Sequence, residues 1–256
     1  IPPQLISRPL WAAGLLALAC ASAQAQITEW PSTVAPGRFR LEMDVLSLSV
    51  DREGGDTYTA YGVASTFITT GVTTNLDVQV GAELFLSQKL DIDNRTERNS
   101  GIGDVYLRAK WRFYDDEAAG LAIAVIPYLK VPTNSGGVGN DSVEGGLIVP
   151  WQAELIGGLD LYAMAELDFL RNDSDDGYDT YWYASMALSR TVTSAVGLYA
   201  EFAAGKSSGG SGWEGTIGGG LTLQVTGALW WDFAVYRGIS RGAADWNPVV
   251  RLNIDF

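Results

Sequence analysis

The acidic side chains are the part of this sequence best suited to chemistry, and the residue counts limit which chemistry that can be. The 256 residues include no His and one Cys, with 30 Asp and Glu against 17 Lys and Arg. A Ser–His nucleophile or a His/Cys metal site therefore cannot be built. A pair such as Glu166 and Asp168 could do acid–base work with carboxylates alone. Because acids recur along nearly the whole chain, solvated side chains explain this pair better, and we expect no enzyme, no metal site and no cofactor.

Charge and hydropathy narrow the class of protein further. A net charge of −13 would repel phosphates, so we expect no nucleic-acid partner. Hydrophobic residues make up 47% of the chain, yet the mean hydropathy is only +0.07. Apolar residues are thus dispersed, and beyond residue 25 no run approaches the ~18 apolar residues of a transmembrane helix. If this part of the chain lies in a membrane, it must cross as a closed β-barrel, since lipid offers no hydrogen bonds to an open sheet.

The long apolar run near the start has the parts of a secretory signal peptide. Arg8 precedes the run 10–19, and Ala23-Gln24-Ala25 supplies a cleavage site of small residues. We therefore expect residues 1–25 to be a signal peptide removed before Gln26. A buried helix of the mature fold is the alternative for this stretch.

Beyond the leader, residues alternate in character with the period of a β-strand. In 159–170, apolar side chains at odd positions alternate with mainly polar ones at even positions, and 75–87 and 103–113 repeat the pattern. A barrel strand needs ~9–11 such residues, with one face to lipid and one to the lumen. A bulge near Val45 and Leu46 would explain why the first strand changes face. The expected twelve strands lie near 38–50, 58–70, 75–88, 102–114, 120–131, 142–154, 159–171, 179–191, 195–206, 215–225, 228–238 and 247–256.

The connections between these strands alternate in length. Five are short turns, such as 155–158, and six are longer and polar or Gly-rich, such as 89–101. Short periplasmic turns opposite longer external loops are typical of bacterial outer-membrane barrels. The predicted fold class is therefore all-β, a transmembrane antiparallel up-and-down β-barrel. It would consist of a short periplasmic N-terminal segment at 26–37 and a barrel over 38–256.

Aromatic residues cluster near both predicted ends of the barrel. Trp111 falls near the periplasmic ends of the strands, whereas Tyr181, Trp182, Tyr183 and Tyr236 fall near the external ends. Two interfacial aromatic belts are typical of a barrel in a bilayer. Each residue taken alone is better explained as an ordinary packed aromatic, so the prediction of two belts depends on their joint position.

The C-terminus has the form of an assembly signal. Val250, Leu252 and Ile254 share one face of the last strand, which ends at Phe256. This resembles the signal by which outer-membrane barrels are recognised for assembly. We therefore expect the barrel-assembly machinery and outer-membrane lipid as partners, and the bacterial outer membrane as the location.

Charged residues on the polar faces are the candidates for the lumen lining. Rings of acids favour cations over anions when a lumen conducts. Cross-lumen ion pairs are the alternative use of the same residues, and we favour that structural pairing over a tuned filter. The candidates are Asp77, Glu83, Asp104, Arg108, Lys110, Arg112, Glu144, Asp160, Glu166, Asp168, Glu201, Asp232 and Arg251.

Two short motifs resemble a known family. Gly101-Ile102-Gly103-Asp104, with Lys110 further along, and later Val131-Pro132-Thr133-Asn134 resemble the outer-membrane transporters grouped with the meta-pathway of phenol degradation. Asn134 stands where that family usually has Gly. The resemblance implies an outer-membrane channel for small aromatic or other hydrophobic compounds.

The function predicted is passive passage of small solutes across the outer membrane. Eight strands leave an interior filled by side chains and ~16–18 leave an open channel, so twelve predict a narrow or partly obstructed lumen. The alternative is a non-conducting structural or adhesive barrel whose external loops bind a partner.

Overall fold

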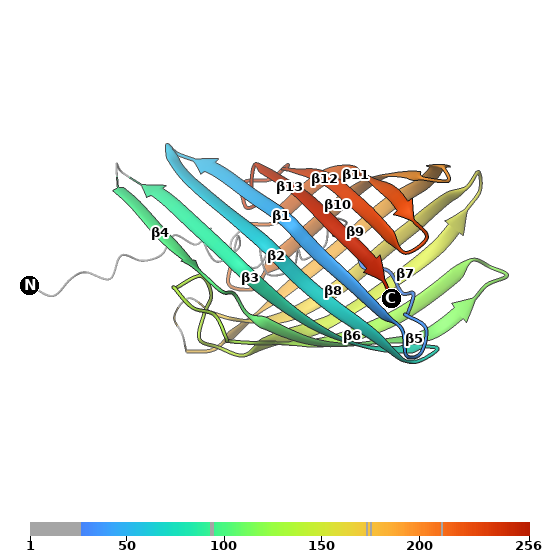
Figure 1. Ribbon diagram of the computed structural model, residues 1–256. Coiled ribbons are helices and arrows are strands. Elements are labelled where there is room, and N and C mark those ends of the chain that lie inside the picture. Colours follow the sequence, from blue (N-terminus) through green and yellow to red (C-terminus); the bar gives the residue numbers. More distant parts are fainter. Residues whose placement is uncertain (1–26, 93–94, 173, 175, 211) are drawn as a thin grey trace, which may run out of the picture.

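The chain forms one closed antiparallel sheet in the computed structural model, which describes residues 27–92, 95–172, 174, 176–210 and 212–256. Its tilted strands surround a central lumen (Figure 1). Neighbours in sequence pair except for β4 and β5, which both pair with β3. β1 pairs with β13, and the pairing of β2 with β3 closes the barrel. The strands are β1 (Phe39–Glu53), β2 (Asp56–Thr73), β3 (Leu76–Ile92), β4 (Arg95–Gly101), β5 (Val105–Asp116), β6 (Leu121–Val131), β7 (Glu144–Leu155), β8 (Leu159–Arg171), β9 (Tyr178–Thr193), β10 (Val196–Ser207), β11 (Glu214–Thr226), β12 (Leu229–Gly238) and β13 (Trp246–Asp255).

The barrel has twelve strand positions because β4 and β5 share one. Residues 86–92 of β3 pair with β4, and residues 76–82 of the same strand pair with β5. The two short strands are thus one strand interrupted at 102–104. This confirms the twelve-stranded up-and-down barrel predicted from the sequence. Among the described residues, no helix has the length and apolar character needed to cross a bilayer.

Side-chain alternation separates an apolar outer face from a polar inner face. On β3, Val78 and Val80 are exposed, whereas Asp77, Gln79 and Glu83 between and beyond them are buried. Exposed large apolar side chains of this kind recur on most strands, which suits a wall in contact with hydrocarbon.

The predicted bulge in the first strand is confirmed. The register between β1 and β13 shifts by one residue between Asp44 and Leu46. Asp44 is fully buried and Leu46 is 48% exposed, so the bulge keeps the apolar residues on both sides of it facing outward.

The short turns lie where they were predicted, but two expected external loops are strand. β1 and β2 are joined by a tight turn at Gly54-Gly55, and residues 95–101 form β4 in a hairpin with β3. The prediction of a loop at 89–101 was wrong, because residues 95–100 belong to a strand whose side chains are exposed on both faces. β4 has no buried face, so its sequence carries no apolar alternation.

The first strand, β1, and the last strand, β13, pair with each other, and their periplasmic ends meet at the end of the barrel that carries the short turns (Figure 1). The N–H groups of Phe39 and Phe256 each donate to the carbonyl of the other, at 3.3 and 2.9 Å. Short turns mark the periplasmic side of outer-membrane barrels, so this is the periplasmic end and the long loops define the external end.

The aromatic belts are partly as predicted. Trp111 and Trp182 are 51% and 62% exposed on the outer face. Tyr181, Tyr183 and Tyr236 are at most 5% exposed, and the prediction that they join the external belt is wrong. They occupy inward positions, where Tyr181 and Tyr236 bond to carboxylates.

Candidate functional site

Residues 27–38, which precede β1, enter the barrel from its periplasmic end. Ile27 N and Thr28 N donate to the two carboxylate oxygens of Glu201, at 3.0 and 2.6 Å. The Thr28 hydroxyl also bonds Glu201 at 2.5 Å and shares a 2.7 Å hydrogen bond with Ser185. Glu201 and Ser185 are inward-facing residues of β10 and β9, and Thr28 is fully buried. We call residues 27–38 the lumenal segment.

The sequence predicted a periplasmic position for this segment, and the structure corrects that. Glu29 forms ion pairs with Arg108 and, at 3.6 Å, with Lys110, and all three side chains are at most 8% exposed. Two cations buried on one face of β5 need a counter-charge, and the segment supplies it. The expected leader, 1–25, and Gln26 lie outside the described residues.

The base of the lumenal segment is held by β3 and β2. Val34 N donates to both carboxylate oxygens of Asp77, at 3.1 and 3.0 Å, and Pro36 forms a parallel bridge with Gly71. A Cβ at Gly71 would lie 2.2 Å from the carbonyl oxygen of Val34. Glycine is therefore required at this close approach of two backbones.

Two further acids on the inner face, Asp44 and Asp232, lie beside Arg251. Arg251 Nε donates to Asp44 at 2.7 Å, and both side chains are at most 3% exposed. Asp232 lies directly opposite Arg251 on the adjacent strand and accepts from the Tyr199 hydroxyl at 2.9 Å.

Tyrosines bond many of the inner acids, which the sequence analysis did not foresee. Each donates its hydroxyl to one carboxylate on another strand, at 2.6 to 2.9 Å. A buried carboxylate needs such donors when no cation is near. The pairs are Tyr128 with Asp168, Tyr181 with Glu214, Tyr199 with Asp232, and Tyr236 with Glu201.

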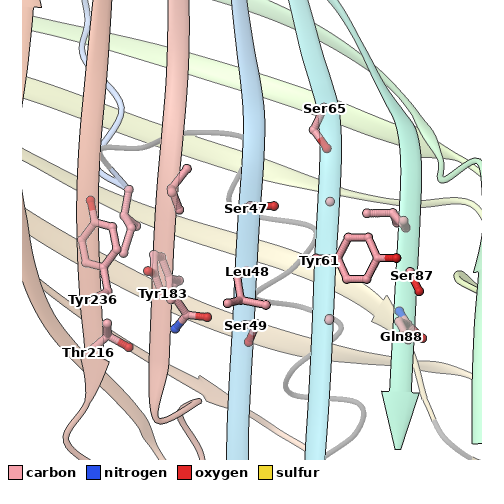
Figure 2. Close-up of a pocket in the computed structure, with 16 residues that line it drawn as sticks. Ser47, Leu48, Ser49, Tyr61, Ser65, Ser87, Gln88, Tyr183, Thr216 and Tyr236 are labelled. Atoms are coloured by element: carbon pink, nitrogen blue, oxygen red, sulfur yellow. The ribbon is translucent and has the colours of Figure 1, made fainter.

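A pocket lies on the external side of Ile27, inside the barrel. It encloses about 900 Å³, part of which is open to solvent, and none of its sixteen lining residues is charged. Its lining comes from β1, β2, β3, β9 and β11–β13 (Figure 2). The Tyr183 hydroxyl is buried there and has no hydrogen-bond partner within the described residues. Serines and Gln88, together with Ile27 and Val249, give the pocket both polar and apolar lining.

Comparison with known protein families shows to which family this barrel belongs. A family model described as "Putative MetA-pathway of phenol degradation" matches residues 22–256. The chain belongs to this family. The family expected from the two motifs is thereby confirmed, and the protein is a bacterial outer-membrane β-barrel.

Solved structures share the fold at low sequence identity. An outer-membrane channel from Pseudomonas putida F1 is 12% identical with a TM-score of 0.69, over 89% of this chain and 98% of that one. The transport unit of the autotransporter AIDA-I from Escherichia coli is 13% identical with a TM-score of 0.56, over 96% and 98%. The NanC porin is 9% identical with a TM-score of 0.52, over 85% and 98%. These three are described as a channel, a transport unit and a porin, and no curated protein sequence matches significantly.

The two motifs that suggested the family meet in space. Asp104 accepts hydrogen bonds from Thr133 N and Asn134 N, both at 3.0 Å, and an ion pair from Lys130 at 3.2 Å. Asn134, which departs from the usual Gly, also donates its side-chain amide to Asp104 at 2.9 Å. The motif carboxylate thus holds the start of the 132–143 loop against the barrel wall.

The same cluster continues toward the external mouth. Lys130 pairs with Glu144 at 2.5 Å, and Glu83 accepts from Asp104 N at 3.1 Å. Gln88 donates to the carbonyl of Val138, which is 2% exposed, so the loop folds inward over β3.

The structure gathers most of the predicted lumen residues on the inner face. Buried there at 7% exposure or less are Asp77, Glu83, Asp104, Lys110, Glu144, Glu166, Asp168, Glu201, Asp232 and Arg251, with the side chain of Arg108 at 8%. Arg112 instead pairs with Asp115 at 3.0 Å and donates to Thr74 at the periplasmic turns, and Asp160 is half-buried at that same end. In the described part of the chain, no group of three or more His, Cys, Asp or Glu side chains is placed to hold a metal ion.

Proposed function

We propose that this protein is a passive channel for small solutes across the outer membrane. The observation that carries the proposal is a closed barrel whose inner face is lined by paired charges and hydroxyls, with the lumenal segment crossing it. A wall of this kind is polar enough to hold water, and the segment narrows the path without adding a separate plug domain.

The solute class is argued from the pocket beyond Ile27. Its lining has no charge to attract an ion, whereas a small uncharged solute can rest on Val249 and bond the Tyr183 hydroxyl, which has no partner among the described residues. Small aromatic or other hydrophobic compounds, with one polar group, fit these walls. The family description, which refers to phenol degradation, supports the same class.

Conductance tests this function directly. Refolded protein in planar bilayers is expected to give small, discrete current steps. A correctly folded barrel that remains silent, and whose liposomes do not swell in small sugars or aromatic alcohols, would contradict the channel.

The second candidate is a non-conducting barrel that binds a partner outside. The hairpin of β3 and β4 favours it, since among the described residues β4 pairs with β3 alone and lies exposed at the external end (Figure 1). A silent barrel that loses binding to cells or matrix when residues 92–96 are replaced by a tight turn would support this candidate instead.

A further inference from the structure

A continuous row of residues crosses the outer surface of six strands near the external end. Each member lies directly opposite the next in the antiparallel register, which places all of them on one face. We call this set the outer row. Its members, from β12 to β4, are Arg237, Trp246, Val50, Thr59, Lys89 and Arg98.

The outer row faces away from the lumen. Leu90 packs inward against Tyr58 and Ala60, so the neighbouring Lys89 points outward. At the other end, Tyr236 is 2% exposed and bonds Glu201 inside the barrel, which turns the adjacent Arg237 outward. Both ends of the row are thus on the surface that meets lipid and water.

The charges of the outer row are arranged for an anion. Lys89 lies directly opposite Arg98, and like charges in that position repel unless an anion lies between them. One acid, Asp91, pairs with Lys89, which leaves an excess of positive charge at this point. Arg237 lies 5.3 Å from the ring centre of Trp246 and adds a third cation to the row.

The surface below the outer row is apolar. Tyr61 and Phe85 lie on it with ring centroids 6.0 Å apart, and Leu46 and Val63 are exposed beside them. Cations directly above an apolar, aromatic wall match a molecule with an anionic head and hydrocarbon chains.

The same arrangement recurs elsewhere at the external end. Arg171 lies 5.5 Å from the ring centre of its opposite residue Tyr178, and Lys206 lies opposite the exposed Trp182. At the periplasmic end, the lipid-facing Arg190 lies opposite Leu198. At the external end, therefore, outward-facing basic side chains lie beside aromatic rings in a chain whose net charge is −13.

We propose that the outer row binds the phosphate groups of a phosphorylated glycolipid in the outer leaflet. Lys89 and Arg98 hold one phosphate and Arg237 a second, while the acyl chains lie against Tyr61, Phe85 and their neighbours. This site is separate from the lumen and does not depend on conduction.

Lipid binding by the full barrel in dodecylmaltoside micelles tests the proposal. Native mass spectrometry measures how much lipid the barrel retains, and thermal unfolding measures its stability. Both are recorded with diphosphoryl lipid A, with the same lipid after dephosphorylation, and with inorganic phosphate. The wild-type protein is expected to retain the diphosphoryl lipid and to unfold at a higher temperature with it. Equal binding of the dephosphorylated lipid, or displacement of the lipid by an equal concentration of inorganic phosphate, would overturn the proposal.

Matched variants locate the site. Lys89→Gln with Arg98→Gln is expected to weaken diphosphoryl lipid binding about tenfold or more, since charge-assisted bonds are lost. Arg237→Gln on the other side of the row should weaken it less, and the charge-retaining Lys89→Arg with Arg98→Lys should keep it. Arg190→Gln, at the periplasmic end, is the control. An equal loss in that control, or none in the double variant, would refute the site.

Discussion

Glu29 and Arg108 form a buried ion pair that joins the lumenal segment to the wall of the barrel. Glu29 comes from a stretch with no regular structure, whereas Arg108 is fixed on β5 beside Lys110. The pair therefore helps to decide where the segment lies, because two buried cations would otherwise lose their nearest counter-charge.

Glu29→Gln is expected to release the lumenal segment. Breaking a buried pair from one side costs about 3–5 kcal/mol, which is comparable to what the hydrogen bonds of Ile27 and Thr28 to Glu201 return. Single-channel conductance should then rise about twofold or more as the bore widens. Glu97→Gln, on the exposed β4, is the control. Unchanged conductance in a folded Glu29→Gln barrel would show that the segment does not limit the path.

Gly71→Ala tests the base of the same segment. The added Cβ would lie 2.2 Å from Val34 O and 2.5 Å from Ala35 O, so one backbone must move. We expect a loss of about 1–3 kcal/mol in unfolding free energy, as in other overpacked sites, together with higher conductance. Gly227→Ala, where nothing lies within 4 Å, should change neither. Normal stability of Gly71→Ala would argue against the close approach.

Asp104→Ala tests the cluster that joins the two family motifs. The change removes the acceptor for Thr133 N and Asn134 N and leaves Lys130 with one carboxylate fewer. The loop from 132 should detach and become a target for limited proteolysis, at a cost of about 2–4 kcal/mol. Asp141→Ala, exposed on the same loop, serves as the control. A loop equally resistant in both variants would remove Asp104 from this role.

The barrel itself could be predicted from the sequence, since its signal is local. Alternation such as that of 159–170 reports the two faces of β8, and short turns such as 155–158 report the hairpin order. β4 was missed because a strand exposed on both faces has no periodic apolar residue. β4 forms because it pairs with β3, and this tertiary pairing leaves no pattern in the local sequence.

The site could be predicted only in part. The acids of the inner face follow from strand parity, but their partners come from other strands. Parity alone would have placed Tyr183 and Tyr181 inside, since they alternate with the outward Trp182. The position of Glu29 could not be predicted, because residues 27–38 carry no pattern that fixes where they lie.

Neutralising Glu166 and Asp168 tests whether inner acids influence the ions that pass. Both lie buried on the inner face of β8, and Tyr128 donates to Asp168 at 2.6 Å. Glu166→Gln with Asp168→Asn should lower cation preference about twofold, because lumen acids favour cations. Reversal potentials in a salt gradient measure it, with Asp176→Asn in the external loop as control. An unchanged reversal potential would assign the two acids to structure alone.

Tyr183→Phe tests the solute class proposed for the pocket. The Tyr183 hydroxyl is buried without a partner in the described part of the chain, so a bound solute with a hydroxyl or carbonyl can satisfy it. Removing it should weaken binding of 4-nitrophenol about threefold to tenfold, the worth of one hydrogen bond, and leave nitrobenzene nearly unaffected. Quenching of tryptophan fluorescence in micelles measures both affinities. Tyr178→Phe, on the outer face at the external rim, is the matched control and should bind both compounds as the wild type does. An equal loss for the two compounds would mean that the Tyr183 hydroxyl does not recognise the hydroxyl of 4-nitrophenol, and the pocket would then select by shape and apolar contact alone.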